Sequence, residues 1–547
     1  MHLFWRGWQR LLLAAWLLLP LGSALAQKPP QSESIEKEFL VQAFKVTGNT
    51  LLAQKTIDSL LQRHTGKNTL TTLRGALAEL QEAYRIIGYG TVNVTLPPQT
   101  LVGGRVEVEV SEGVLNDILV HGNKYSEAQT TKQSLPTLRK GKVPNLLDID
   151  TNTVLFNENP AQTVKVVFQP GPKNGTVDAL VRIDDQPKSR WNANLNNTGR
   201  PNTGLYRAAI NFQNANLTGH DDVLGLRAQA SPSRLQDTLS FGAMYKRPIY
   251  SQLSALEFSA NYSDSKNISS STAAGDLTMS GKGMSVGTKY HWYLPRVGEG
   301  KRQVSLGWDF QKFLNDCSLG EFGSAGCGTA AASVQTQPLS IAYSIQSLGE
   351  YSGNISFSKN AFATGADGSA SAFESVRPGA NPSYSILRGS YTATVLQPDG
   401  SSVTWRMAAQ ATPDGLVPGE QFGLGGASTV RGYQEREVVG DQGFNASLEW
   451  NFRSKTVDEW LRTNVQSSRT INATFAVFAD YGQVSNQLGT VCQNNSIACS
   501  LGSVGVGVVL SSSNKWSLRL DLARALLNSV STQKDQSALH FSLHYEI

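Results

Sequence analysis

Residues 444–453, FNASLEWNFR, decide the fold of the second half of the chain. In an extended strand successive side chains point to opposite faces, so the apolar residues of this stretch would share one face. They are Phe444, Ala446, Leu448, Trp450 and Phe452. The polar residues between them would share the other face, and the same alternation recurs at residues 516–522 and 539–547. Such strands fit either a membrane β-barrel with a wet lumen or a β-sandwich with a dry core.

From about residue 189 onward, stretches of this kind are separated by turns rich in Gly, Ser, Asn and Asp, and we expect short strands and no helix of any length. The region accommodates about 16 strands at roughly 22 residues per strand and connection, an even number suited to an outer-membrane barrel. Trp and Tyr near the strand ends, together with the leader described next, favour the barrel over the sandwich. The sequence therefore predicts a 16-stranded antiparallel transmembrane β-barrel over residues 188–547.

Residues 1–26 have the features of a secretory signal peptide. Arg6 and Arg10 precede an apolar stretch over residues 11–21, and Ala24-Leu25-Ala26 supplies the small residues of a cleavage site. The alternative is a membrane anchor, but the apolar stretch is shorter than the ~20 residues of a membrane-spanning helix. We therefore expect an exported protein whose mature chain opens with a short linker, residues 27–38.

Two small α/β modules with the order βααββ are expected before the barrel, over residues 39–112 and 113–187. Their openings are similar: QAFKVTGNT at residues 42–50 and NDILVHGNK at residues 116–124. Helices are expected near residues 53–62 and 126–135, at residues 146–156, and at residues 73–87, where Leu73, Leu77, Leu80, Tyr84 and Ile87 would share a face. Coincidence in a short Gly-Asn pair is the alternative to a true repeat.

Two motifs accompany these modules. Residues 418–433 read PGEQFGLGGASTVRGY, and Phe478-Ala479-Asp480 lies within the predicted strand TFAVFADYG at residues 474–482. Alternation places Ala479 on the lipid face and Asp480 on the lumen face, where a charge needs water or a partner. The Gly-rich stretch lacks the following helix that a phosphate site requires.

The two modules, the R-G-Y motif in its Gly-rich context and the later F-x-D motif together resemble the outer-membrane transporters of two-partner secretion, the family that exports filamentous haemagglutinin and secreted haemolysins. The resemblance covers the whole mature chain and implies two polypeptide-transport-associated (POTRA) domains followed by the barrel. It also implies that a long loop, residues 412–442, folds back into the barrel. Its tip would be formed by Val430, Arg431, Gly432 and Tyr433, with Arg431 meeting Asp480 beside Phe478. A solvated loop charge at Arg431 is the alternative.

The resemblance implies a location in the outer membrane of a Gram-negative bacterium, with the POTRA domains in the periplasm. A large secreted partner, such as an adhesin, a cytolysin or a contact-dependent toxin, would bind there and cross the barrel unfolded, without ATP. Its extended segment would add to an exposed sheet edge. The candidate edge residues are Thr91, Val92, Asn93, Val94, Thr95 and Leu96. Outer-membrane lipid and the barrel-assembly machinery would be further partners.

Two other functions stay open at this point. A barrel-assembly insertase shares the modules and the R-G-Y loop, although such proteins usually carry more modules. A passive porin or nutrient receptor would not need periplasmic protein-binding modules. The net charge of +5 on 547 residues gives no sign of a nucleic-acid partner.

Four cysteines form two local pairs, Cys317 with Cys327 and Cys492 with Cys499. In an oxidising compartment these spacings favour two disulfides that tie loops, and two separate hairpins do not make one metal site. His540 and His544 share a strand face but would lie ~13 Å apart, too far for one ion. No nucleotide-binding or hydrolase motif is present. We therefore expect no metal, no cofactor and no enzymatic activity.

Overall fold

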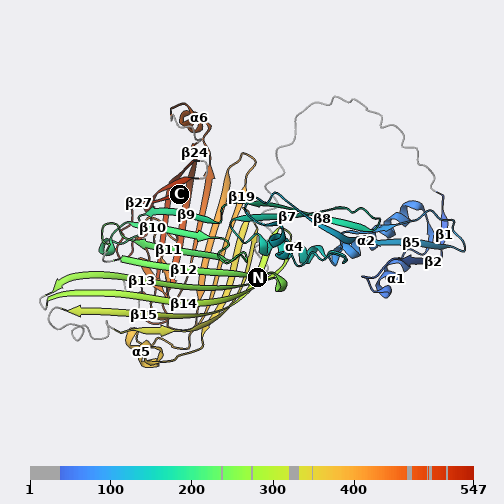
Figure 1. Ribbon diagram of the computed structural model, residues 1–547. Coiled ribbons are helices and arrows are strands. Elements are labelled where there is room, and N and C mark those ends of the chain that lie inside the picture. The colour runs from blue at the N-terminus through green and yellow to red at the C-terminus, as the bar shows by residue number, and fades with distance from the viewer. Residues whose placement is uncertain are drawn as a thin grey trace, which may run out of the picture. The chain divides into compact units, whose positions relative to one another are not determined.

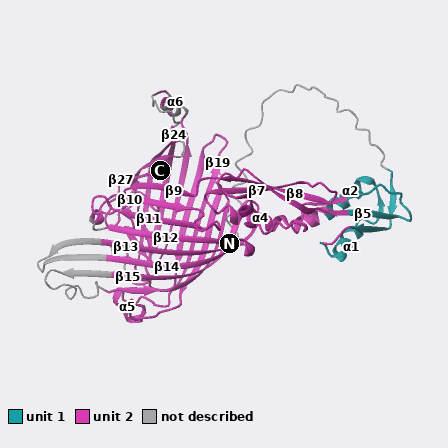
Figure 2. Ribbon diagram, viewed as in Figure 1, with its two compact units in different colours: residues 1–47, 51–80, 95–109 teal, residues 48–50, 81–94, 110–547 magenta. Residues whose placement is uncertain are grey.

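The computed structural model describes residues 37–235, 238–272, 275–319, 332–347, 349–464, 471–489, 491, 496–512 and 515–547 (Figure 1). The chain divides into two compact units (Figure 2): residues 1–47, 51–80 and 95–109 form one, and residues 48–50, 81–94 and 110–547 form the other. The predicted signal peptide and most of the predicted linker lie outside the described residues. Among the described residues no helix has the length and apolar character needed to cross a membrane.

The first module contains five strands and two helices. In chain order they are β1 (Phe39–Val41), β2 (Ala43–Thr47), α1 (Gln54–Gln62), β3 (Gly66–Asn68), α2 (Leu70–Ile86), β4 (Val92–Thr95) and β5 (Arg105–Glu112). A three-stranded sheet has the order β2-β5-β4, with β2 parallel to β5. Two expectations need correction: a small β1–β3 pair is added to the predicted βααββ order, and Ile87 follows the end of α2 and is exposed. The other four residues predicted for the buried face of α2 are buried.

The second module follows the predicted order. Its elements are β6 (Val114–His121), α3 (Ala128–Gln133), α4 (Leu146–Phe156), β7 (Gln162–Pro170) and β8 (Thr176–Asp185). The sheet order is β6-β8-β7, the equivalent of β2-β5-β4. Its core includes Leu115, Leu135, Phe156, Val164 and Val181, all essentially without solvent contact. Removing these apolar side chains from water stabilises the folded module.

Matched positions in the two modules have the same backbone geometry. Gly48 and Gly122 follow the first sheet strand of each module and have φ of +83° and +91°, a conformation that side chains with a Cβ rarely adopt. A Cβ at either position would overlap a carbonyl oxygen of the last strand, that of Val110 or Ile183. The glycine of the Gly-Asn pair is therefore a structural requirement shared by both copies.

A carboxylate at the end of each module's last strand caps the segment that follows this glycine. The Thr50 N–H donates to Glu112 at 2.7 Å, and the Lys124 N–H donates to Asp185 at 2.8 Å. Asp185 also accepts from the N–H groups of Tyr125 and Ser126, at 2.9 and 2.8 Å. These bonds fix the entry into the helical part of the second module.

The strands after Asp185 close into a barrel, which confirms the predicted barrel and excludes the sandwich. The short β16 (Val334–Thr336) pairs with β15 and continues in line with β17, so the barrel has 16 strands, and β27 pairs with β9 to close it. The strands are β9 (Ser189–Asn196), β10 (Arg207–Asn214), β11 (Val223–Ala230), β12 (Thr238–Ile249), β13 (Ser254–Thr272), β14 (Gly275–Val297), β15 (Gly300–Leu319), β17 (Pro338–Ser347), β18 (Tyr351–Asn360), β19 (Ser385–Leu396), β20 (Ser402–Ala411), β23 (Gln442–Phe452), β24 (Ile471–Ser485), β25 (Ala498–Ser512), β26 (Trp516–Ala525) and β27 (Ser537–Glu546).

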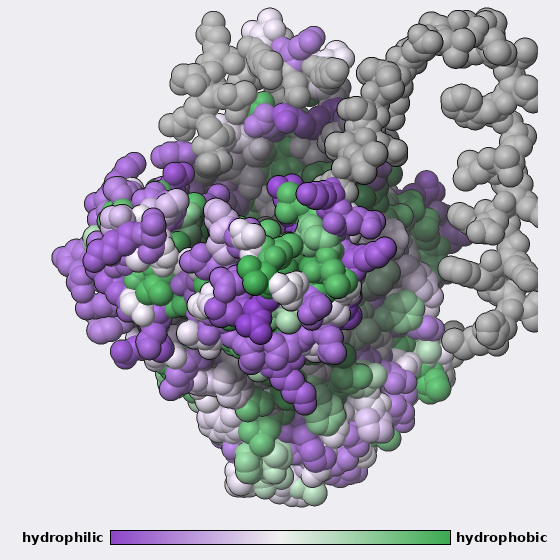
Figure 3. All heavy atoms as spheres, turned by 90° about the vertical axis from the view of Figure 1, so that its right-hand side faces the viewer, coloured by the Kyte–Doolittle hydropathy of each residue, from purple (hydrophilic) through white to green (hydrophobic). Residues whose placement is uncertain are grey.

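The two faces of the barrel wall differ in polarity as the alternation predicts. Leu448, Trp450 and Leu522 point outward and are about half exposed, whereas Glu449 and Asp521 point inward and are buried. An outward apolar band is what a bilayer requires, and inward charge requires partners within the lumen. On the face of the molecule shown in Figure 3, hydrophilic residues in purple lie around smaller apolar patches in green.

Two expectations for the barrel region are wrong in detail. Strands β13, β14 and β15 are long, at 19, 23 and 20 residues, because turn-forming residues such as those of SDSKNISSST at 263–272 lie within a paired strand. The connections also contain helices: α5 (Ala370–Val376) and the ten-residue α6 (Lys455–Asn464), whose sequence includes good helix formers such as Lys, Glu, Leu and Arg.

The Asp185 cap predicts an acid-sensitive second module. Burial raises the pKa of Asp185, but its backbone hydrogen bonds outweigh burial, and the net pKa lies below the ordinary value. A carboxyl whose folded pKa is lowered stabilises the protein above its unfolded pKa of ~3.9, and this stabilisation disappears as the pH falls through the folded pKa. Asp185→Asn should therefore cost about 1–2 kcal/mol at pH 7 and progressively less below pH ~4.

Urea unfolding of the wild type and of Asp185→Asn at several pH values, with hydrogen exchange of the amides of residues 124–126 as the local readout, checks this. A stability difference that is the same at pH 7 and at pH ~3 would contradict it.

Candidate functional site

A long loop between β20 and β23 carries the R-G-Y motif. The loop contains a short antiparallel hairpin, β21 (Phe422–Leu424) paired with β22 (Val438–Gly440). The segment between these two strands turns sharply at Gly432, whose φ is +91°. We call residues 428–434 the loop tip; the side chains of Val430, Arg431 and Tyr433 contact the inner wall of the barrel.

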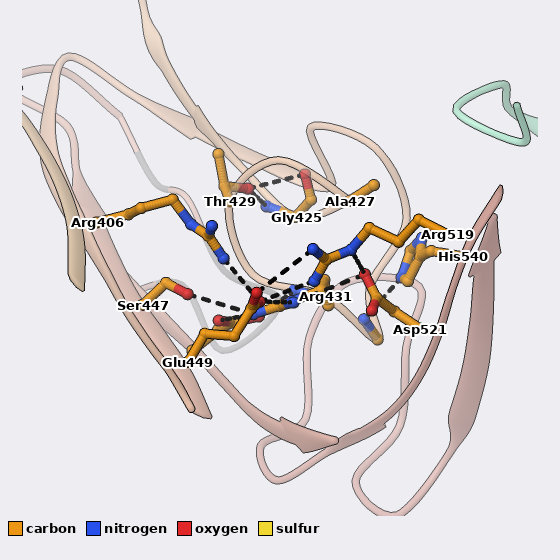
Figure 4. Close-up of polar contacts among 12 residues, drawn as sticks. Arg406, Gly425, Ala427, Thr429, Arg431, Ser447, Glu449, Arg519, Asp521 and His540 are labelled. Carbon is orange, nitrogen blue, oxygen red and sulfur yellow. Dashed lines mark hydrogen bonds and ion pairs between the residues drawn. The ribbon is translucent and has the colours of Figure 1, made fainter. Parts of the chain in front are cut away.

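Arg431 at the loop tip is buried, with 3% of its surface exposed, and its guanidinium meets two carboxylates (Figure 4). Its Nε and Nη2 donate to the two carboxylate oxygens of Asp480 at 2.7 and 2.8 Å, the two-pronged geometry that arginine forms best. Its Nη1 donates to Glu449 at 2.8 Å, and its backbone N–H donates to Asp480 at 3.1 Å. The structure therefore brings Arg431 and Asp480 together as a buried pair and not as solvated charges.

The pair belongs to a larger group of ionic side chains on strands β20, β23, β24 and β26 (Figure 4). Arg406 and Arg519 each lie 2.8 Å from Glu449, and Arg519 also lies 2.7 Å from Asp521. Together with Arg431 and Asp480 they form the ionic cluster, in which three arginines face three carboxylates. A balanced set of this kind compensates the cost of taking each charge out of water.

Phe478 explains the spacing of the F-x-D motif. In a strand, residues two apart lie on the same face, so Phe478 and Asp480 both point into the lumen. The guanidinium carbon of Arg431 lies 3.3 Å from the centre of the Phe478 ring. Asp480 thus supplies the negative partner of the guanidinium, and Phe478 supplies an aromatic face. An aromatic face attracts a cation that has been removed from water.

The other tip residues are held by the wall as well. The Gly432 N–H donates to Nε2 of His540 on β27 at 2.9 Å, which requires that this nitrogen carry no proton. The Tyr433 hydroxyl lies 2.9 Å from the carbonyl oxygens of both Gly502 and Leu527, and its single proton is shared between these two acceptors. Val430 and Tyr433 are buried in a small apolar cluster with residues of β24 and β25. The loop tip is therefore attached by ionic, polar and apolar contacts.

The base of the loop has a separate attachment at Asp441, which is completely buried. Arg377, from the connection that contains α5, donates to both oxygens of its carboxylate. The N–H groups of Leu416 and Gln487 donate to it at 3.0 and 2.8 Å. Asp441 therefore joins the base of the long loop to two neighbouring connections.

Glu449, Arg519, Asp521, Arg406 and His540 were not among the predicted site residues. Each occupies a polar position of an alternating strand, and that pattern nominates them as lumen residues. Alternation within one strand gives no information on which charges of different strands meet. Their convergence around Arg431 could therefore be found only from the three-dimensional structure.

The remaining predicted residues lie elsewhere. The predicted edge Thr91–Leu96 contains β4, which lies at one edge of its sheet. Cys499 is disulfide-bonded, and its expected partner Cys492 lies outside the described residues. Cys317 is on β15, while Cys327 lies outside the described residues, so both pairings stay predictions. In the part of the chain that is described, no His, Cys, Asp and Glu side chains gather as a metal site.

The ionic cluster predicts that removing one carboxylate frees the loop tip. Asp480→Asn leaves Arg431 with two of its three carboxylate partners, Glu449 and Asp521, and breaking a buried pair costs about 3–5 kcal/mol. In a Val430→Cys background, where the thiol replaces a fully buried side chain, Asp480→Asn should raise the rate of labelling by a maleimide at least roughly tenfold. Asp535→Asn, which removes an exposed partner of Arg524, is the matched control. Unchanged labelling in a folded Asp480→Asn barrel would contradict the role assigned to this pair.

Comparisons with known proteins place the chain in a family. The family model "Haemolysin secretion/activation protein ShlB/FhaC/HecB" matches residues 178–510, and the model "POTRA domain, ShlB-type" matches residues 39–113. The outer membrane transporter CdiB of Escherichia coli O6:K15:H31 (strain 536 / UPEC) is 25% identical over 433 residues, which are 76% of this chain and 70% of that protein. The heme/hemopexin transporter protein HuxB of Haemophilus influenzae (strain ATCC 51907 / DSM 11121 / KW20 / Rd) is 25% identical over 174 residues, 31% of each chain.

Two solved structures have the same fold. CdiB from Escherichia coli superposes with a TM-score of 0.78 at 18% identity, covering 96% of this chain and 94% of that one. CdiB from Acinetobacter baumannii gives 0.71 at 17% identity, covering 95% and 93%. Since the first family model spans more than half of the sequence, the chain belongs to the ShlB/FhaC/HecB family of haemolysin secretion/activation proteins, the outer-membrane transporters of two-partner secretion, with its POTRA region in the periplasm.

Proposed function

We propose that this protein captures one large exported polypeptide in the periplasm and conducts it, unfolded and without ATP, through the barrel to the cell surface. The observation that carries the proposal is the ionic cluster: a loop tip is attached to the inner wall of a closed barrel by contacts that water can replace. The names of CdiB and HuxB as transporters support the same role.

The attachment suits an obstruction that must move. Strong ion pairs hold the loop tip while they are intact, yet the same charges are well solvated if the tip moves into a wet lumen. A tip held only by apolar packing would instead expose apolar surface to water on release. The long loop therefore acts as the movable part, and the wall strands that carry Glu449, Asp480 and Asp521 stay fixed.

Capture would take place at the edge strand β4 of the first module. Val92 and Val94 point into the module core, while Asn93 and Thr95 are exposed. An edge strand offers unpaired backbone N–H and C=O groups to an extended segment of another chain. Main-chain pairing then supplies affinity for an unfolded polypeptide, and the exposed side chains supply selectivity.

The energy would come from the exported polypeptide. The periplasm holds no ATP, and the sequence has no P-loop. Folding of the emerging polypeptide outside the cell makes each outward step hard to reverse, because a folded segment no longer fits the lumen.

Deletion of this protein, followed by comparative proteomics of the culture supernatant, cell surface and outer membrane, tests the proposal. Loss of one very large exported protein, with other outer-membrane barrels unchanged, is the expected result. A general fall in outer-membrane barrels would make the protein an assembly insertase instead, and an unchanged set of exported proteins would contradict secretion.

Complementation of the deletion strain tests the capture edge. The pair Asn93→Lys and Thr95→Lys places two charges on the edge strand and should lower export roughly fivefold, a loss of about 1 kcal/mol in binding. The pair Ser59→Lys and Gln62→Lys adds the same charge on the exposed face of α1 and serves as the control. Equal export by the two variants would rule out this edge as the capture site.

A further inference from the structure

We propose that the exported polypeptide crosses the barrel along one side of the lumen only, a surface that we call the neutral lane; this inference rests on the proposed function. The neutral lane lies on β15, β17 and β18. Its residues are Gln303, Ser305, Ser340, Ser344, Asn354 and Ser356. All six carry uncharged hydroxyl or amide groups.

Strand register makes the neutral lane continuous. Gln303 on β15 is opposite Ser344 on β17, which in turn is opposite Asn354 on β18. One row further along, Ser305 and Ser356 flank Ala342. Because the register is antiparallel and without shifts here, these side chains form adjacent rows across three strands.

The neutral lane borders free space. It lines a cavity of about 380 Å³ that extends from β13 to β19. Charged residues line the same cavity, among them Lys289 on β14, Asp309 on β15 and Glu420 of the long loop. The side chains of Gln303, Ser340 and Ser356 have no hydrogen-bond partner in the described protein, so their donors and acceptors are available to a chain that passes.

The opposite side of the lumen is occupied. The loop tip contacts residues of β23, β24 and β27 through Glu449, Asp480 and His540, and it also reaches β25 and β26. The charged groups of that side are already paired with one another in the ionic cluster. A polypeptide on that side would have to displace these ion pairs. In the neutral lane the described structure offers two hydrogen bonds to displace, Asn354 to Ser344 and Ser305 with His291.

The chemistry of the neutral lane fits an unfolded polypeptide of varied sequence. An extended chain carries backbone N–H and C=O groups that need partners, and hydroxyl and amide side chains both donate and accept. Each such bond contributes only about 0.5–1.5 kcal/mol net, so contacts form and break easily. The absence of fixed charge among the six residues means that no particular residue type is held or repelled.

Site-specific photocrosslinking in living cells tests the proposal on the full-length protein. The probe is p-benzoylphenylalanine, placed at Ser344 or Ser356 in the neutral lane, at Ser517 on β26 near the ionic cluster, or at Ile341 on the lipid face of β17. Adducts with the polypeptide that disappears from the supernatant on deletion should form at Ser344 and Ser356 at least several-fold more than at Ser517, with none at Ile341.

Equal or stronger adducts at Ser517 would overturn the neutral lane while leaving passage through the barrel intact. Adducts at no lumen position in a strain that still exports would overturn both the lane and passage through the lumen. Failure of the proposed function has a different signature, an unchanged supernatant in the deletion strain.

A pair of charge substitutions gives a second readout. Ser344→Arg with Ser356→Arg narrows the neutral lane and adds fixed charge, and export should fall at least roughly fivefold. Ser344→Asn with Ser356→Asn keeps neutral donors and acceptors and should export within about twofold of the wild type. Heat-dependent mobility in gels verifies that both barrels are folded. Normal export by the arginine pair would overturn the inference.

Discussion

A buried guanidinium must be paired, and the long loop is organised around that requirement. Arg431 is 3% exposed between Asp480 and Glu449, and an unpaired charge in this position would cost several kcal/mol. Its partners stand on different strands, so β23, β24 and β26 must keep their register for the carboxylates to converge. The pairing of Arg431 with these carboxylates depends on the closed barrel, on the F-x-D spacing and on the sharp turn at Gly432.

The two attachments of the loop differ in a way that matters for transport. Asp441 joins the base to neighbouring connections through Arg377 and the Gln487 N–H, and it is entirely buried. The loop tip is held by charges that face a wet lumen once they separate. Under the proposed function, movement of the tip with a fixed base therefore disturbs the fewest contacts.

Part of this site follows from the sequence because strand periodicity is local. Two-residue alternation placed Asp480 on the lumen face and explains why Phe478, two residues earlier, lies on the same face. The Gly-Asn pairs of the two modules revealed the repeat. Convergence of Glu449, Arg519 and His540 could not be derived, since it depends on the stagger of strands far apart in the chain. The lengths of β13 to β15 were misjudged because pairing with neighbours overrides the turn preference of Ser, Asn and Asp.

Export by Arg431→Ala, measured together with barrel insertion and with Arg524→Ala as the control, tests most directly whether the buried arginine governs transport. Arg524 forms an exposed pair with Asp535 at 3.0 Å, and such pairs contribute little. If the ionic cluster positions the loop for transport, the Arg431→Ala barrel should insert normally but lose most of its export. The Arg524→Ala barrel should export as the wild type does. Full export by an inserted Arg431→Ala barrel would contradict the central role of this arginine.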